Sequence, residues 1–129
     1  MERTRIDSGT AWEERVGYSR AVRVGPHVHV SGTTATDEDG EIVGVGDLAA
    51  QAERALANVE AALHEAGAEL SDVVRTRVYV TDIEHWETVG DVHGEYFGAV
   101  RPAMSLLEVS GLVDDRLLVE IEAVAYIDP

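Results

Sequence analysis

Two acidic side chains near the end of the sequence have the type and spacing for proton chemistry. Glu120 and Glu122 lie two residues apart in an apolar segment, and a β-strand projects such residues from one face. A carboxyl group can donate or accept a proton, so Glu120 is a candidate catalytic residue. A structural interpretation stays open for both glutamates, because they can also pair with arginine on a neighbouring strand. For Glu122, a salt bridge to Arg75 or Arg77 is favoured.

Other arrangements that could do chemistry are incomplete. His27 and His29 share one face of a short alternating segment, but no third ligand accompanies them, so no metal is predicted. Ser31 has no His and Asp at the spacing of a hydrolytic triad. The glycine-rich stretch 40–46 lacks the Lys-Ser/Thr ending of a phosphate-binding loop. Cysteine is absent, which excludes disulfides, thiol catalysis and thiolate metal sites. No cofactor is predicted.

The charge balance bears on possible partners. The sequence has 10 Lys plus Arg against 25 Asp plus Glu, a formal net charge of −15, and every basic residue is arginine. Such a surface repels a polyanion, so nucleic acid is not predicted as a partner. Two explanations of the acidity stay open. It suits a salt-rich cytoplasm, where counterions screen self-repulsion, and it also fits GC-rich coding that favours arginine over lysine.

Length and composition predict one domain over residues 1–129. The sequence is 45% hydrophobic and 27% charged, enough to bury a core. No apolar run approaches the roughly 18 residues that span a bilayer, and the first twenty residues mix Glu, Arg and Asp. Neither a membrane protein nor a signal peptide is predicted, and we expect a cytoplasmic protein.

The strands that position these residues follow from alternating hydrophobicity. We expect strands at residues 20–24, 27–31, 41–43, 73–80, 101–109 and 117–127. In the longest β-branched segment, one face is predicted to carry Val74, Thr76, Val78 and Val80. The other face is predicted to carry Arg75, Arg77 and Tyr79.

Two amphipathic helices are expected between the strands. Asp47 is placed to cap the first, whose apolar residues recur at three- and four-residue steps until Gly67 ends it. Asp82 is placed to cap the second, at roughly 84–97. The two caps predict the residues at which the helices begin.

The element order predicts an α/β (α+β) fold, a mixed sheet with two long helices on one face. The opposite face mixes Arg, Tyr, Leu, Val and Glu, which is too apolar for solvent and too charged for a core. We therefore expect a closed oligomer. Gly90 and Gly94 weaken the second helix and predict close backbone packing on their side.

Nine short segments also follow one known pattern in order and spacing. They are Val28–Gly32, Asp47–Gln51, Ala55–Asn58, Ala66–Gly67, Asp72–Val74, Val78–Asp82, Tyr96–Phe97, Arg101–Ala103 and Val119–Ala123. In this respect the sequence resembles the RidA/YjgF family, from about Gly17 to Tyr126. The resemblance implies a chorismate-mutase-like fold in a homotrimer, with the sheets forming an inner barrel and small-molecule clefts at the subunit interfaces. It also implies cofactor-free hydrolysis of enamines and imines to a 2-keto acid and ammonia. Some relatives are described instead as endoribonucleases or translation inhibitors.

The resemblance implies roles for individual residues. Glu120 matches the family's water-positioning glutamate, and Tyr18 matches a tyrosine near the start of the chain. Ser31 and Gly32 match the Ser-Gly pair that lines the cleft. The implied partner is a small carboxylate or imine-like metabolite.

Four positions depart from the deaminase pattern. Met104 stands where an arginine binds the substrate carboxylate, and Leu106 stands where cysteine is common. Gly90 replaces a frequent asparagine, and Arg20 replaces a glutamine. A thioether cannot form the charge-assisted pair of a guanidinium, a loss of about 2–5 kcal/mol.

Three alternatives follow from Met104. A second arginine supplies the cation, with Arg20 the first candidate and Arg101 or Arg75 behind it. The cleft takes a neutral or more apolar substrate. Or the trimer binds a small molecule or regulatory partner without turnover, and endoribonuclease-like activity ranks below these on charge. The predicted site has Glu120 as catalytic residue and, as binding residues, Tyr18, Arg20, Ser31, Gly32, Met104 and Leu106.

Overall fold

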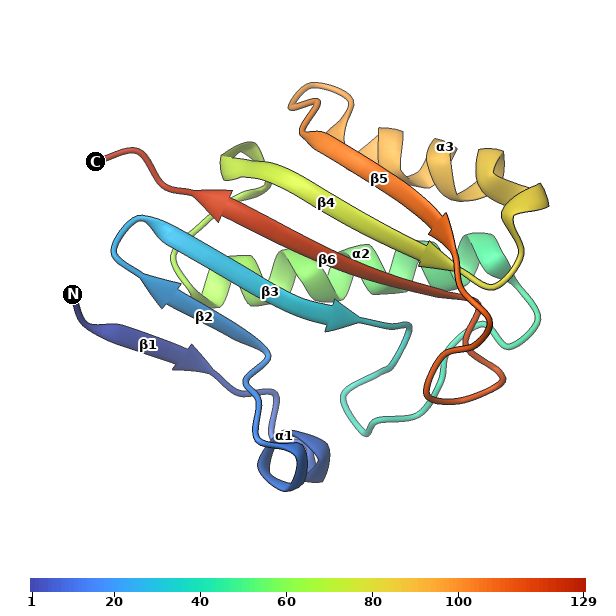
Figure 1. The fold of residues 1–129 in the computed structure, drawn as a ribbon, viewed down its shortest axis with the longest axis horizontal. Helices are drawn as coiled ribbons and strands as arrows, with labels where there is room; N and C mark the ends of the chain where they lie inside the picture. Colours follow the sequence, from blue (N-terminus) through green and yellow to red (C-terminus); the bar gives the residue numbers. More distant parts are fainter.

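A mixed six-stranded sheet carries two long helices on one face (Figure 1). The computed structural model describes residues 1–129. Its strands are β1 (Arg3–Ile6), β2 (Ala21–Val24), β3 (His27–Thr33), β4 (Val73–Val80), β5 (Ala103–Glu108) and β6 (Val119–Tyr126). Its helices are α1 (Ala11–Val16), α2 (Leu48–Glu65) and α3 (Trp86–Phe97).

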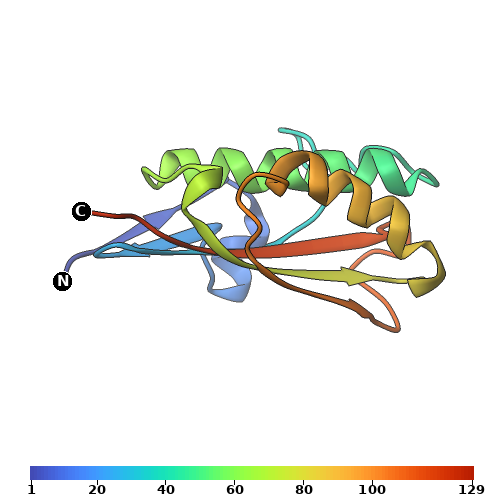
Figure 2. The same cartoon turned by 90° about the horizontal axis from the view of Figure 1, so that it is seen from above.

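The sheet order is β1-β2-β3-β6-β4-β5, antiparallel except for the parallel pair β4–β5. Both α2 and α3 lie on one side of this sheet (Figure 2). The predicted α/β (α+β) fold with two long helices on one face is confirmed. No helix combines the length and the apolar character needed to cross a membrane.

Helix α2 packs closely against the sheet because its buried stripe is rich in small side chains. Asp47 caps it by accepting a hydrogen bond from the Ala50 N–H, as predicted. Gly67 follows the helix in the left-handed region at φ +85°, where glycine is unstrained. The buried stripe consists of Gln51, Ala52, Ala55, Leu56, Val59, Ala62 and Leu63.

Strand β6 runs through the middle of the sheet and decides which side chains face the helices. Its buried residues alternate with half-buried ones, as expected for a strand covered on one face. Val119 and Ile121 face the core, while Glu120 and Glu122 project from the opposite, uncovered face. The prediction that these two glutamates share a face is confirmed.

The predicted faces of β4 are wrong at Val74. Val73 pairs with Ala125 and Arg75 pairs with Val124, so one extra residue lies between these pairs on β4. This bulge reverses the local alternation. Val73 is buried and Val74 is 50% exposed.

The prediction of close backbone packing at the α3 glycines is also wrong. A Cβ added at Gly94 would have no heavy atom within 4 Å. A Cβ added at Gly90 would meet only a Trp86 ring carbon at 3.8 Å, an ordinary contact. These glycines face open space.

Two N-terminal elements were not predicted, and one predicted strand is reduced. Strand β1 and helix α1 span only four and six residues, too short to show a period in the sequence. The strand expected at 41–43 consists of a single bridge between Thr36 and Ile42. The second long helix begins at Trp86, after a 3₁₀ turn at Ile83–His85 that Asp82 caps.

A fully buried amide ties α2 to the chain segment that enters β6. The Gln51 side chain donates hydrogen bonds to the carbonyl oxygens of Gly44 (3.2 Å) and Arg116 (2.8 Å). Its carbonyl oxygen accepts from the Leu118 N–H at 2.8 Å. Gln51 therefore holds Leu118, the residue before β6 begins and two residues before Glu120.

Replacing this amide tests its role in the fold. We expect Gln51→Leu to lower the free energy of unfolding by about 3 kcal/mol, because three backbone groups lose the partner that the fully buried Gln51 side chain gives them. Urea unfolding measures the change, with Ala57→Leu on the exposed face of α2 as control. A loss no larger than that of the control would show that Gln51 does not hold the segment.

Candidate functional site

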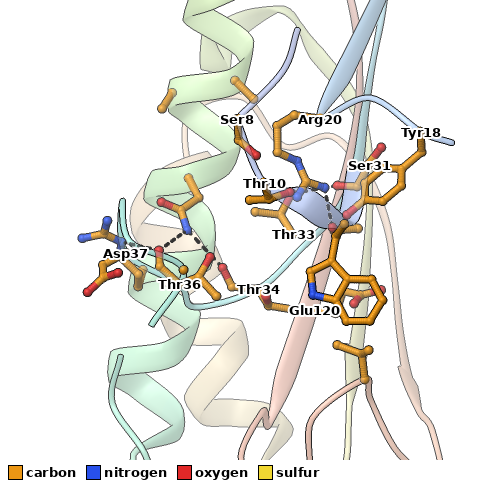
Figure 3. A pocket seen from close by; sticks show the side chains of 18 of the residues that line it. Ser8, Thr10, Tyr18, Arg20, Ser31, Thr33, Thr34, Thr36, Asp37 and Glu120 are labelled. Carbon is orange, nitrogen blue, oxygen red and sulfur yellow. Dashed lines mark hydrogen bonds between the residues drawn. The ribbon is translucent and has the colours of Figure 1, made fainter. Parts of the chain in front are cut away.

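A hollow of about 960 Å³ lies where the N-terminal segment, the end of β3, α2 and β6 meet (Figure 3). The residues lining it include five of the predicted site residues. These are Tyr18, Arg20, Ser31, Gly32 and Glu120. They come from three segments distant in sequence, brought together by the pairing of β2 with β3 and of β3 with β6.

Glu120 is the half-buried carboxyl group of this hollow. Burial raises its pKa above the ordinary glutamate value, and the neighbouring charge of Glu122 raises it further. The positive charge of Arg20 opposes this shift. A carboxyl group with a raised pKa exchanges protons closer to neutral pH, as a general acid or base must.

Gly32 leaves the space that the Glu120 carboxyl occupies. A Cβ at this position would lie 2.5 Å from Glu120 Oε2, closer than real contacts. The register of β3 against β6 also shifts between Val30 and Thr33, so the chain around Gly32 departs from regular pairing. A larger residue would push the carboxyl group out of its place.

Two arginines line the hollow, Arg20 and Arg54, and Arg20 is the one whose charge acts on Glu120. Its guanidinium donates a hydrogen bond from Nη2 to the Gly32 carbonyl and lies 6.0 Å from the centre of the Tyr18 ring. Its Nε is buried without a partner, and no other side-chain hydrogen bond of the chain engages the group. Its Nη1 forms no hydrogen bond and is not buried, so Arg20 retains a donor for an anion in the hollow.

Ser31 and Tyr18 shape the hollow. The Ser31 hydroxyl donates to the Ser19 carbonyl at 2.6 Å, and the Ser31 N–H donates to the Arg20 carbonyl at 3.0 Å. This serine holds the segment of Tyr18 and Arg20 against β3. The Tyr18 side chain, 39% exposed, forms part of the wall.

Glu122 also lines the hollow, and two contacts anchor it there. It lies 3.8 Å from Arg77 and accepts a hydrogen bond from the Tyr79 hydroxyl at 3.1 Å. The predicted salt bridge to Arg77 is confirmed. Its negative charge is thereby fixed close enough to raise the pKa of Glu120.

Met104 and Leu106 lie elsewhere in the chain. On β5 they pair with Thr76 and Val78, which are fully buried under the helices. They line a second hollow, of about 410 Å³, between β5 and α3. Glu120 projects from the opposite face, so one chain alone does not bring these two residues to it.

The remaining cation and metal candidates line neither hollow. Arg75 donates from Nη2 to the Ser105 hydroxyl at 2.8 Å, and Arg101 is exposed with φ +53°. His27 and His29 are both exposed, and the His27 ring packs edge-on against Tyr126. No three His, Asp or Glu side chains gather as metal ligands would.

Sequence reasoning missed the N-terminal wall of the hollow. Glu13 is buried and accepts hydrogen bonds from Ser8 and Thr10, which fixes α1. Burial alone would raise the pKa of Glu13, but these hydrogen bonds outweigh it and lower the pKa. Trp12 and Val16 of α1 line the hollow while largely exposed. No periodicity in the sequence marks this helix.

A second missed feature holds the loop after β3. The Asn58 amide donates to the carbonyl oxygens of Thr34 (3.0 Å) and Thr36 (2.8 Å), and Arg54 Nε donates to Thr36 at 3.1 Å. The signal was present in the sequence, because Asn58 is a polar side chain next to the apolar stripe of a helix. These contacts set the rim of the hollow opposite α1.

Comparison with known proteins gives a consistent result. A family model described as Endoribonuclease L-PSP matches residues 9–127. A crystal structure from Mycobacterium tuberculosis, described as a member of the YjgF/YER057c/UK114 family, is 52% identical with a TM-score of 0.89. It covers 98% of this chain and 100% of its own. A RutC family protein of Pyrococcus abyssi is 44% identical over 110 residues, 84% of this chain and 85% of that protein. The 3-aminoacrylate deaminase RutC of Acinetobacter baylyi is 36% identical over 110 residues, 85% of this chain and 86% of that protein.

Neutralising the buried carboxyl group should stabilise the protein at neutral pH. Because the folded-state pKa of Glu120 is raised, folding favours the protonated form, and stability falls as pH rises through the interval above the ordinary glutamate pKa. We expect Glu120→Gln to raise the urea midpoint at about pH 7 and to match the wild type below about pH 4.

Glu38→Gln serves as the control for this measurement, because it makes the same charge change at an exposed carboxyl group and should shift the urea midpoint less than Glu120→Gln does. A Glu120→Gln protein that is less stable than the wild type at neutral pH would contradict the interpretation.

Proposed function

The chain belongs to the Endoribonuclease L-PSP family, as its resemblance to RidA/YjgF proteins predicted, and from this premise we propose that it hydrolyses enamines and imines. The products are a 2-keto acid and ammonia, and no cofactor takes part. The observation that carries the proposal is Glu120, a half-buried carboxyl group with a raised pKa, held beside the cation of Arg20. A relative named 3-aminoacrylate deaminase supports the same class of reaction.

Hydrolysis of an imine needs one water molecule and two proton transfers. In the proposed reaction Glu120 aligns the water on the imine carbon and accepts a proton as the C–O bond forms. That proton passes to the nitrogen and gives a carbinolamine. Glu120 then moves the proton of the new hydroxyl group to the same nitrogen, the C–N bond breaks, and ammonia leaves as the carbonyl forms. An enamine first accepts a proton at carbon and reacts as the imine. Partial burial of Glu120 suits it to both directions of proton transfer.

Arg20 is proposed to hold the substrate carboxylate. It takes the role of the arginine that Met104 replaces, and its Nη1 has no hydrogen-bond partner in the hollow that also contains Glu120. A guanidinium in a partly dry cleft binds a carboxylate through charge-assisted hydrogen bonds. Tyr18, Ser31 and Gly32 complete the wall on this side.

The active assembly is proposed to be a homotrimer of one-domain chains. Glu120 lies on the uncovered face of the sheet, and Met104 and Leu106 lie in a different hollow. A cleft that contains all of them therefore requires two copies of the chain. The uncovered face and its edge leave Val74, Leu107 and Tyr126 between 42% and 50% exposed, which favours contact between copies.

Ribonuclease activity, the other activity named for this family, is disfavoured by charge. The chain carries a formal net charge of −15, and acidic side chains such as Asp37, Glu38 and Asp114 line the same hollow as Glu120. A phosphate backbone would be repelled from such a cleft.

A coupled assay with freshly generated 2-imino acids tests the proposed reaction. We expect ammonia release above the buffer rate, and Glu120→Gln to lower kcat by about a hundredfold to ten-thousandfold. Glu38→Gln makes the same charge change at the exposed rim of the hollow and should stay within about twofold of the wild type. If the wild type does not accelerate the reaction over buffer, the proposal fails and the alternative of a non-catalytic binding protein is supported. Cleavage of RNA without imine hydrolysis would also overturn the proposal.

Restoring the cation at position 104 tests the shared cleft. We expect Met104→Arg to raise kcat/KM for the imine of alanine by about tenfold or more, since it adds a second charge-assisted contact to the carboxylate. Sedimentation should show a trimer for both proteins. A monomeric wild type, or no gain from the arginine in an intact trimer, would contradict a cleft shared between copies.

A further inference from the structure

The hollow between α3 and β5 has a composition of its own. Its walls come from Ile83, Trp86, Met104 and Leu106, and it contains no acidic side chain and no lysine or arginine. Its volume of about 410 Å³ lies within the range of small-molecule sites, roughly 300–1,000 Å³. The only side-chain nitrogens in its lining belong to Trp86 and His93.

His93 closes the inner end of this hollow as a neutral group. Its Nε2 lies 2.8 Å from the Thr76 hydroxyl, and its ring packs on Phe97 with centroids 4.8 Å apart. Thr76 is fully buried, and this is the only side-chain hydrogen bond of its hydroxyl. Burial lowers the pKa of His93, which keeps the ring uncharged at neutral pH. A carboxylate would find no cation here.

Two glycines of α3 keep the hollow open. Each costs roughly 1 kcal/mol of helix stability relative to alanine. Neither Gly90 nor Gly94 has a positive φ, and no backbone approaches either of them, so neither the turn chemistry nor the packing of this chain requires glycine. Both line the hollow, one helical turn apart. Side chains at these positions would fill the space that the glycines leave.

We propose that this hollow is the specificity subsite of the cleft and takes an apolar side chain of the substrate, of the size of leucine or phenylalanine. The inference rests on the proposed function and on the cleft being shared between copies. The carboxylate and the imine carbon then lie at Arg20 and Glu120 of one copy. The substrate side chain enters between Trp86 and Met104 of the next copy. The flexible thioether of Met104 adapts to side chains of different shape.

The test compares imines generated from alanine, leucine and phenylalanine by an amino-acid oxidase. For the wild type we expect kcat/KM for the leucine and phenylalanine imines to exceed that for alanine by about tenfold or more. Gly94→Leu should abolish this preference while raising the melting temperature, because leucine is a better helix former. Asp91→Leu on the exposed side of α3 should raise the melting temperature and leave the preference unchanged.

Gly94→Ala provides a milder variant should the leucine prevent folding, and it should weaken the preference without loss of stability. Calorimetry with the keto acids of leucine and alanine separates this inference from the proposed function. If no imine is turned over, but the leucine keto acid binds at least tenfold more tightly and Gly94→Leu removes that difference, the subsite stands and the deaminase proposal fails.

Two outcomes would overturn the subsite while the deaminase proposal stands. The first is a wild type that hydrolyses the alanine and leucine imines with equal kcat/KM, with no change in this ratio in Gly94→Leu. The second is dissociation of the trimer by Gly94→Leu in sedimentation, which would show that a side chain of a neighbouring copy fills the hollow.

Discussion

The site depends on one constraint, the period-two alternation of β6 in the middle of a sheet that is covered on one face only. The core requires Val119, Ile121, Ala123 and Ala125 to point toward the helices, and all four are buried. The side chains between them are thereby directed to the uncovered face. A shift of β6 by one residue would bury the glutamates under α2, so the packing that stabilises the fold also fixes Glu120 at its site.

The two hollows are where the chain departs from rules that favour stability. At the first, a carboxyl group with a raised pKa lies beside a buried guanidinium nitrogen without a partner. At the second, Gly90 and Gly94 weaken a helix without a steric reason. The other buried side-chain nitrogen and oxygen atoms have hydrogen-bond partners, as the three hydrogen bonds of Gln51 illustrate. Departures of this kind are expected where a surface serves a ligand.

The sequence predicted the long elements well because each repeats its pattern over several turns or pleats. The face of Glu120 followed from simple alternation in β6. The bulge at Val74 could not be predicted, because one extra residue leaves no trace in a β-branched run. The fit between Gly32 and the Glu120 carboxyl joins residues 88 positions apart and depends on the shifted register of β3. The separation of Met104 from Glu120 likewise depends on how β5 pairs with β4.

The position of the cation changes how a substrate is held in the proposed enzyme. An arginine at position 104 would belong to a different chain from Glu120, so the distance from carboxylate to water would be set across a subunit interface. Arg20 lies in the same hollow as Glu120, and its link to the Gly32 carbonyl fixes both groups to one stretch of β3. The reacting end of the substrate is then positioned within one chain. The β5 side of the cleft no longer needs to bind a charge, which leaves Met104 and Leu106 able to select the apolar end of the substrate.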